Sequence, residues 1–150
     1  DAASTNPASN VRSTISSAWG SARWGTMRVI TGVAAGAGAN VAFACDIVLA
    51  ARSAQFLQAF AKIGLIPDCG GTWLLPRLVG RGNAMALAML GDKLPAEDAA
   101  RLGLVWRAFD DDVFMAETMA IAAKLAALPS RVLAETNLRV GRFAYSSDRR

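Results

Sequence analysis

One stretch of the chain could stabilise negative charge on a bound carbonyl group. Residues 32–46, GVAAGAGANVAFACD, follow an expected strand, pass through Gly and Ala, and enter a short apolar helix expected over residues 36–44. Only such small residues let another molecule approach the backbone closely. The first amides of a helix also lack an intrahelical acceptor and carry the positive end of its dipole. The stretch could therefore donate N–H groups to an anion or to a polarised carbonyl oxygen.

Three interpretations of this stretch remain open on the residues alone. A nucleotide-phosphate loop fits poorly, because Val41 stands where the dinucleotide fingerprint has Gly or Ala and the P-loop Lys is missing. The small residues could instead serve only to pack a helix tightly on a sheet. The third interpretation is an oxyanion hole for a thioester or ester carbonyl, which needs support from elsewhere in the chain.

A second loop carries a single acid. Asp68 lies between Pro67 and Gly70-Gly71, in a run that is otherwise apolar. We expect a carboxyl group in that setting to be partly desolvated, which would suit it to accept and return protons. Asp68 could equally cap the helix that follows, although Thr72 could do so itself. The spacing does not decide between these two roles.

The composition excludes several other kinds of site. The 150 residues contain no histidine, which removes Ser-His-Asp and Cys-His catalysis and the commonest metal ligand. Cys45 and Cys69 form no CxxC pair, so we expect a reducing, cytoplasmic setting and no metal site. The net charge of +4 is dispersed along the chain, which argues against nucleic-acid binding. No apolar run of about 18 residues predicts a membrane span, and the polar N-terminus does not resemble a signal peptide.

The pattern of elements predicts an α/β architecture, because strand and helix patterns alternate. Hydrophobic residues make up 53% of the chain and charged residues 19%, as in a globular domain. Residues 1–26 show no clear periodicity, and we expect them to be disordered. For the acids at 110–112, a helix start is favoured over a metal site, because acids complement the helix dipole. Strands are expected at 27–31, 46–51, 53–58 and 104–109, and helices at 36–44, 73–79, 83–90, 95–103, 110–128 and 130–140.

Three segments together resemble the crotonase (enoyl-CoA hydratase/isomerase) superfamily over about residues 29–138. They are GVAAGAGAN with ACDIV at 32–48, FAKIGLIPDCGGTW with LPRLVG at 60–80, and LGDKLPAEDAARLGLVW at 90–106. Within this family the chain most resembles the isomerases of phenylacetate degradation, which act on 2-(1,2-epoxy-1,2-dihydrophenyl)acetyl-CoA. The resemblance implies a partial ββα spiral core over 27–109 and a shortened helical C-terminal region over 110–150. Residues 1–26 do not match, so we expect the N-terminal half of the family fold to be missing.

The resemblance also implies roles for individual residues. The amide of Ala37, with Gly36 and Gly38 beside it, corresponds to a donor that binds the thioester oxygen and stabilises an enolate. Hydratases of the family carry two glutamates where this chain has Asn40 and Phe60, and Asp68 matches the acid of the isomerase branch. We expect the substrate site to be lined by the following residues: Gly36, Gly38, Asn40, Phe60, Gly70 and Gly71.

The function that this resemblance implies is isomerisation of an acyl-CoA thioester. Asp68 would move a proton from one carbon to another, and coenzyme A would enter as part of the substrate, with no separate cofactor. Family resemblance further implies a homo-oligomer, a trimer or hexamer. The alternatives are an inactive or truncated family member and, in the same chemical class, an enoyl-CoA hydratase or a hydrolase.

Overall fold

The computed structural model describes residues 27–146, so the prediction of disorder for residues 1–26 lies outside the described part. The described chain divides into two compact units, residues 27–118 and residues 119–146. Each unit is treated separately below.

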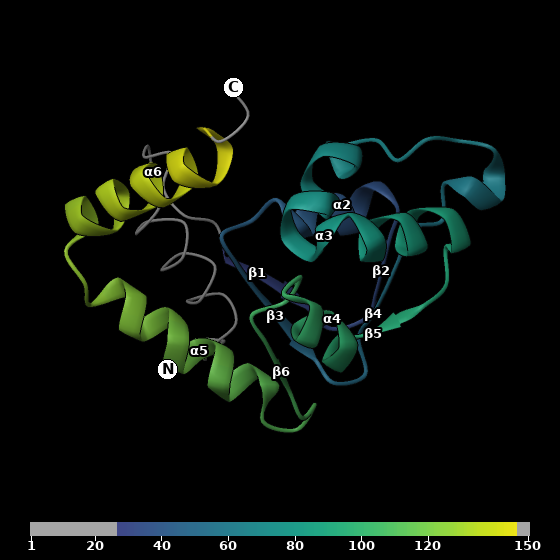
Figure 1. Cartoon of the computed structure of the whole chain (residues 1–150). Helices are drawn as coiled ribbons and strands as arrows, with labels where there is room; N and C mark the ends of the chain where they lie inside the picture. Colours follow the sequence, from purple (N-terminus) through teal and green to yellow (C-terminus); the bar gives the residue numbers. More distant parts are fainter. Residues whose placement is uncertain (1–26, 147–150) are drawn as a thin grey trace, which may run out of the picture. The chain divides into compact units, whose positions relative to one another are not determined.

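The larger unit is built from a repeated strand–strand–helix pattern, drawn from purple through teal to green in Figure 1. The first repeat contains β1 (Met27–Ile30), β2 (Val33–Ala35) and α2 (Ala37–Phe43). The second contains β3 (Ile47–Ala51), β4 (Gln55–Leu57), the 3-10 turn η1 (Ala61–Ile63) and α3 (Gly71–Leu90). Then follow β5 (Leu94–Pro95), α4 (Ala96–Leu102) and β6 (Arg107–Phe109).

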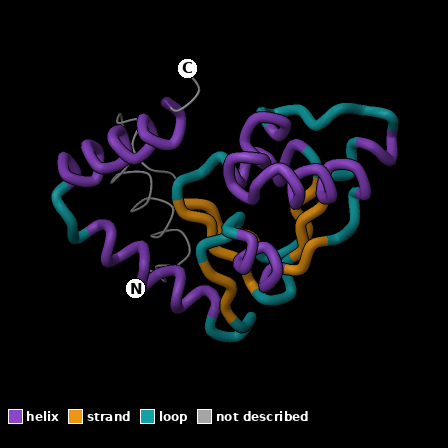
Figure 2. Tube along the Cα trace, viewed as in Figure 1, coloured by secondary structure: helices purple, strands orange, loops and turns teal. Residues whose placement is uncertain are grey.

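Corresponding strands of successive repeats lie next to each other, which gives the unit two small sheets (Figure 2). In one sheet β3 pairs in parallel with both β1 and β6, with Met27 opposite Ile47. In the other, β4 pairs in parallel with β2 and antiparallel with β5, with Val33 opposite Gln55. Each repeat thus adds one strand to each sheet, which confirms the predicted α/β core of ββα spiral type.

The core of this unit lies where α2, α3 and α4 meet the strands. Four successive residues of β3, from Val48 to Ala51, are buried, as is typical of a parallel strand covered on both faces. The rings of Phe43 and Phe56 pack with centroids 5.2 Å apart and join α2 to β4. Leu75 of α3 and Val105 belong to the same buried cluster. This packing fixes α2 and α3, which carry the candidate site.

Most predicted elements are found near their expected positions. β2, β5 and the turn η1 were not predicted, and the strand expected at 104–109 is confined to β6. The two helices expected at 73–79 and 83–90 are both present, because α3 consists of two helical segments joined by a kink at Gly80 (φ 75°, ψ 161°). Gly91 and Gly103 end α3 and α4 in the left-handed conformation expected of helix-terminating glycines.

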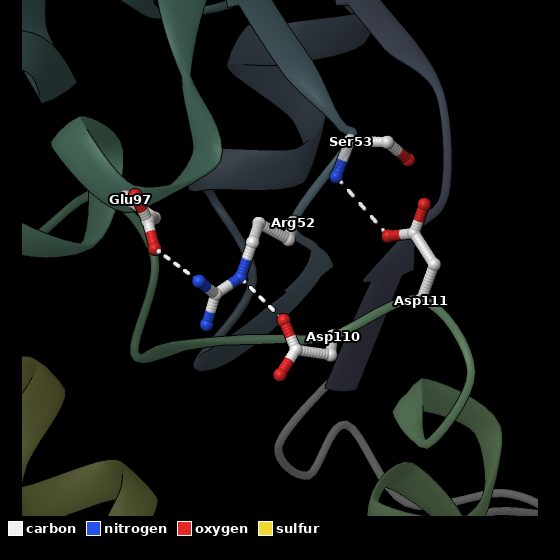
Figure 3. A network of polar contacts seen from close by, with 5 residues as sticks. All are labelled: Arg52, Ser53, Glu97, Asp110 and Asp111. Carbon is white, nitrogen blue, oxygen red and sulfur yellow. Dashed lines mark hydrogen bonds and ion pairs between the residues drawn. The ribbon is translucent and has the colours of Figure 1, made fainter.

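Two of the acids at 110–112 hold a turn with their side chains, although the helix expected after these acids is present and begins at Phe114. Arg52, in the turn between β3 and β4, forms ion pairs with Asp110 (Nε to Oδ1, 2.6 Å) and with Glu97 (3.0 Å) (Figure 3). The Asp111 carboxylate accepts a hydrogen bond of 3.1 Å from the Ser53 N–H, and hydrogen bonds from Ser53 are the main reason why its pKa is lowered. Asp110 and Asp111 therefore hold this turn, and the prediction that they cap a helix is wrong.

The helix that follows these acids, α5 (Phe114–Ala126), runs from the larger unit into the smaller one. Pro129 then separates it from α6 (Ser130–Ser146), which begins where the sequence predicts a helix start and extends beyond the expected end at 140. An ion pair of 2.7 Å between Glu135 and Arg139 lies along α6. None of the helices within residues 27–146 combines the length and the hydropathy needed to cross a bilayer.

Candidate active site

The start of α2 has a backbone geometry that requires glycine at position 36. Gly36 has φ 51° and ψ −123°, and its N–H donates to the Leu57 carbonyl oxygen over 2.9 Å. A Cβ at this position would also lie 3.3 Å from Cζ of Phe60, whose ring is buried against it. Gly36 therefore lets the chain turn from β2 directly into α2, so that Ala37 becomes the first residue of the helix.

The two residues that follow present their backbone to the surface. Ala37 is half-buried, Gly38 is exposed, and a Cβ on Gly38 would meet no atom within 4 Å. No acceptor for the Ala37 N–H is found in the part of the chain that the structure describes. By contrast, Ala39 and Ala42 are buried in the core. Tight packing therefore explains the small residues at 39 and 42 but not those at 37 and 38.

Asp68 occupies the first position of a tight turn that leads into α3. Its carbonyl oxygen accepts a hydrogen bond from the Gly71 N–H at 2.8 Å, which closes the turn. Both central residues have positive φ, 47° at Cys69 and 78° at Gly70, as in a type I′ turn. Gly70 is the N-cap of α3 and no side chain caps this helix, so the alternative role of Asp68 as a helix cap is excluded.

The Asp68 side chain is exposed, so the expectation of a partly desolvated carboxyl group is wrong for this structure. The apolar neighbours that motivated it do not cover it: Ile66 is 79% exposed and Trp73 is 41% exposed. The carboxylate of Asp68 affects the pKa of the adjacent Cys69 thiol. Partial desolvation, the negative charge of Asp68 and a hydrogen bond to its carboxylate together raise the pKa of Cys69.

Asn40 joins the Asp68 turn to α2. Its side chain is completely buried, and Nδ2 donates to the Asp68 carbonyl oxygen at 2.9 Å. Its Oδ1 accepts a hydrogen bond of 2.8 Å from Nε2 of Gln58, which follows β4. Asn40 lies three residues after Ala37, a rise of about 4.5 Å along the helix. The backbone of the Asp68 turn is therefore held against the first turn of α2, close to the candidate oxyanion donor.

The other predicted site residues surround this junction. Phe60 is 6% exposed and packs on Gly36, and Gly71 is buried against Asn40, while Gly70 is exposed. Contact of these residues with a substrate stays a prediction. Both positions at which the hydratase pattern has glutamate carry buried, non-ionisable side chains here. Within residues 27–146, no three His, Cys, Asp or Glu side chains are grouped so that they could hold a metal.

Gln58 is the residue of this junction that the sequence analysis did not single out. It is 3% exposed, and its Oε1 lacks a hydrogen-bond partner among the described residues. Its position in the sequence could have identified it, because it is the only strongly polar residue between the aromatic residues Phe56 and Phe60. A polar side chain in such a run must find a buried partner.

The repeated β-β-α units, with parallel pairing between their corresponding strands, define a crotonase-type fold. A solved enoyl-CoA hydratase from Mycobacterium avium subsp. paratuberculosis K-10 matches it with a TM-score of 0.76 at 40% identity. That match covers 79% of this chain and 50% of the solved chain. The family model described as enoyl-CoA hydratase/isomerase matches residues 3–141. The chain therefore belongs to the enoyl-CoA hydratase/isomerase family.

Two curated relatives match the chain at similar identity but carry different names. The 1,2-epoxyphenylacetyl-CoA isomerase of Escherichia coli (strain K12) is 54% identical over 101 residues, which are 67% of this chain and 38% of the relative. A Rhodobacter capsulatus protein named "Probable enoyl-CoA hydratase" is 53% identical over 108 residues, 72% of this chain and 42% of the relative. The chain thus spans about two fifths of the length of these relatives.

Proposed function

We propose that the chain carries the proton-transfer site of an acyl-CoA isomerase. Asp68 would act as the proton carrier, and the Ala37 N–H as one donor to the thioester oxygen. The observation that supports this most directly is the hydrogen bond of 2.9 Å from Asn40 to the Asp68 carbonyl oxygen, because it joins the acid's turn to the helix that begins at Ala37.

The proposed reaction needs one acid and no added atoms. The Asp68 carboxylate removes a proton from the carbon next to the thioester carbonyl of a 3-enoyl group, and the electron pair of that C–H bond is delocalised onto the thioester oxygen. The Ala37 N–H and the positive end of α2 stabilise the resulting enolate. The Asp68 carboxyl group then returns the proton to another carbon of the conjugated system, so the double bond moves. Coenzyme A takes part only as the carrier of the acyl group.

The side chains at positions 40 and 60 favour isomerisation over addition of water. In the hydratase pattern two acids share the work of activating water and protonating carbon. Here both positions hold side chains that cannot ionise, Asn40 and Phe60, which are 0% and 6% exposed. Asp68 remains as the acid of this junction. One carboxyl group suffices for a 1,3 proton shift, because it accepts and donates the same proton.

Hydration is the second candidate activity, because a hydratase-named relative is 53% identical. Incubation of the purified chain with 2-enoyl-CoA and 3-enoyl-CoA thioesters in water enriched in oxygen-18 separates the two activities. An isomerase yields a product of unchanged mass with a displaced double bond, whereas a hydratase yields a product heavier by one labelled water. Absence of both products would favour an inactive family member and overturn the proposal.

We also propose that the chain functions as a homo-oligomer, in line with the trimers and hexamers that its resemblance to the family implies. Several large apolar side chains of the larger unit lie on the surface, including Ile63 (69% exposed), Ile66 (79%) and Met89 (65%). Exposed apolar surface of this kind favours association. Size-exclusion chromatography coupled to light scattering would test this, and a monomer at micromolar concentration would contradict it.

A further inference from the structure

The buried amide of Asn40 has both polar ends committed to protein atoms. Nδ2 donates to the Asp68 carbonyl oxygen at 2.9 Å, and Oδ1 accepts from Gln58 Nε2 at 2.8 Å. A carbonyl oxygen can only accept, so the group that faces Asp68 must be a donor. An asparagine meets this need, whereas an ionised aspartate or glutamate at position 40 would place acceptor against acceptor.

The turn that Asn40 holds is an unfavourable one for its sequence. Cys69 is the one non-glycine residue with positive φ in the described part of the chain, and Gly70 beside it is also left-handed. L-residues with a side chain resist this conformation, so it persists only where surrounding contacts fix it. The Asp68 carbonyl oxygen accepts two hydrogen bonds, from Gly71 N–H within the turn and from Asn40 outside it. Asn40 is thus an external anchor for this turn.

We propose that Asn40 is a positioning residue, whose amide fixes the Asp68 turn and so places the Asp68 carboxyl group beside the start of α2. The inference rests on the proposed function, in which Asp68 carries the proton. It also assigns position 40 a different task from substrate contact, because its side chain is completely buried. An acid at this position could not hold the turn in the same way. The asparagine at position 40 would therefore favour a site with one acid, Asp68, over a site with two acids.

Gln58 provides a matched control, because it bonds to the opposite end of the same amide. In Gln58→Met the hydrogen bond to Asn40 Oδ1 is lost, but the bond from Asn40 to Asp68 remains. In the double variant Asn40→Leu/Gln58→Met, both bonds are lost and no charge is introduced. The single variant Gln58→Met and this double variant therefore differ in the bond to Asp68. If leucine at position 40 prevents folding, Asn40→Ser combined with Gln58→Met serves as a second variant.

The Cys69 thiol reports on this turn without any need for activity. Its pKa is raised by partial desolvation, by the charge of Asp68 and by a hydrogen bond to the Asp68 carboxylate, and all three depend on the conformation of the turn. In the full chain carrying Cys45→Ser, the rate of alkylation by iodoacetamide is measured as a function of pH. We expect Gln58→Met to keep the parental profile. In the double variant the profile should shift toward that of a free cysteine, about pH 8.5.

Turnover measured on the same proteins completes the test. We expect the double variant to lose about 10- to 100-fold in kcat relative to Gln58→Met with little change in KM, because small misplacements of a reacting group are costly. Coincident alkylation profiles would overturn the inference, and so would a shifted profile with unchanged kcat. A parental chain that does not isomerise would instead overturn the proposed function, while the alkylation profiles would still decide whether Asn40 positions the turn.

Discussion

The side-chain amide of Asn40 occupies the space that a side chain at position 71 would need. An ideal Cβ on Gly71 would lie 2.3 Å from Asn40 Nδ2 and 2.8 Å from its Cγ. Both residues are buried, so neither can move aside into solvent. The glycine at the start of α3 and the asparagine in α2 therefore depend on each other.

Gly71→Ala should consequently destabilise the chain, by about 1–3 kcal/mol, as is usual for overpacking of a buried site. The free energy of unfolding from urea titration would measure this. Gly82→Ala is the matched control in the same helix, because a Cβ there meets no atom within 4 Å. That change should stabilise the chain by up to about 1 kcal/mol through helix propensity. Equal effects of the two substitutions would show that the close approach of Asn40 is not important.

Asp68→Asn should abolish most of the isomerase activity and leave the fold unchanged. General acid–base catalysis contributes about 10²- to 10⁴-fold, so we expect a loss of kcat in that range. Asp68 is exposed, and its carbonyl oxygen, not its carboxylate, holds the turn, so the melting temperature should change little. Steady-state kinetics together with thermal unfolding would test both expectations. A variant that isomerises at the parental rate would remove Asp68 from the mechanism.

Gly36→Ala and Gly38→Ala should separate folding from binding at the start of α2. Position 36 has φ 51° and crowds Phe60, so alanine there should cost about 1–3 kcal/mol in unfolding free energy. Position 38 is open and helical, so alanine there should not destabilise the fold. It should nevertheless weaken binding of an acyl-CoA, because the added methyl group stands where we propose that the thioester approaches. Calorimetric titration with a non-hydrolysable acyl-CoA analogue would measure this effect.

The carboxyl group of Asp111 should make the stability of the folded chain depend on pH. Hydrogen bonds from Ser53 are the main cause of its lowered pKa in the folded chain. The ionised carboxylate therefore stabilises the fold above the unfolded pKa of about 3.9, and this contribution is lost as the pH falls through the folded value. The difference in melting temperature between the parent and Asp111→Asn should shrink as the pH falls from 6 to 3. A difference that stays constant over this pH range would show that these hydrogen bonds do not stabilise the folded chain.

Local sequence patterns predicted those elements whose ends and faces are set by neighbouring residues. β3 follows from a run of aliphatic residues, and α4 follows from Pro95 at its start and Gly103 at its end. β2 is different, because Val33-Ala34-Ala35 has little strand propensity of its own. Its extended shape comes from pairing with β4, more than twenty residues later, which local patterns do not report.

The candidate site was predictable in its residues but not in their contacts. The glycines and Asp68 stood out by type and spacing, and the structure places them on two adjoining segments. The buried amide of Asn40 bonds to a carbonyl oxygen 28 residues away, and Asp110 and Asp111 bind a turn nearly 60 residues earlier. Such partners are determined by the packed fold, and residue type alone does not reveal them.

Within residues 27–146, both sheets have a strand of the first repeat at one border, since β1 flanks β3 and β2 flanks β4. The outward backbone groups of such border strands remain competent to pair with another strand. Because the two borders belong to one repeat, a further segment of the same pattern could extend both ladders together. Among the described residues, both sheets therefore end on the same strand–strand–helix repeat.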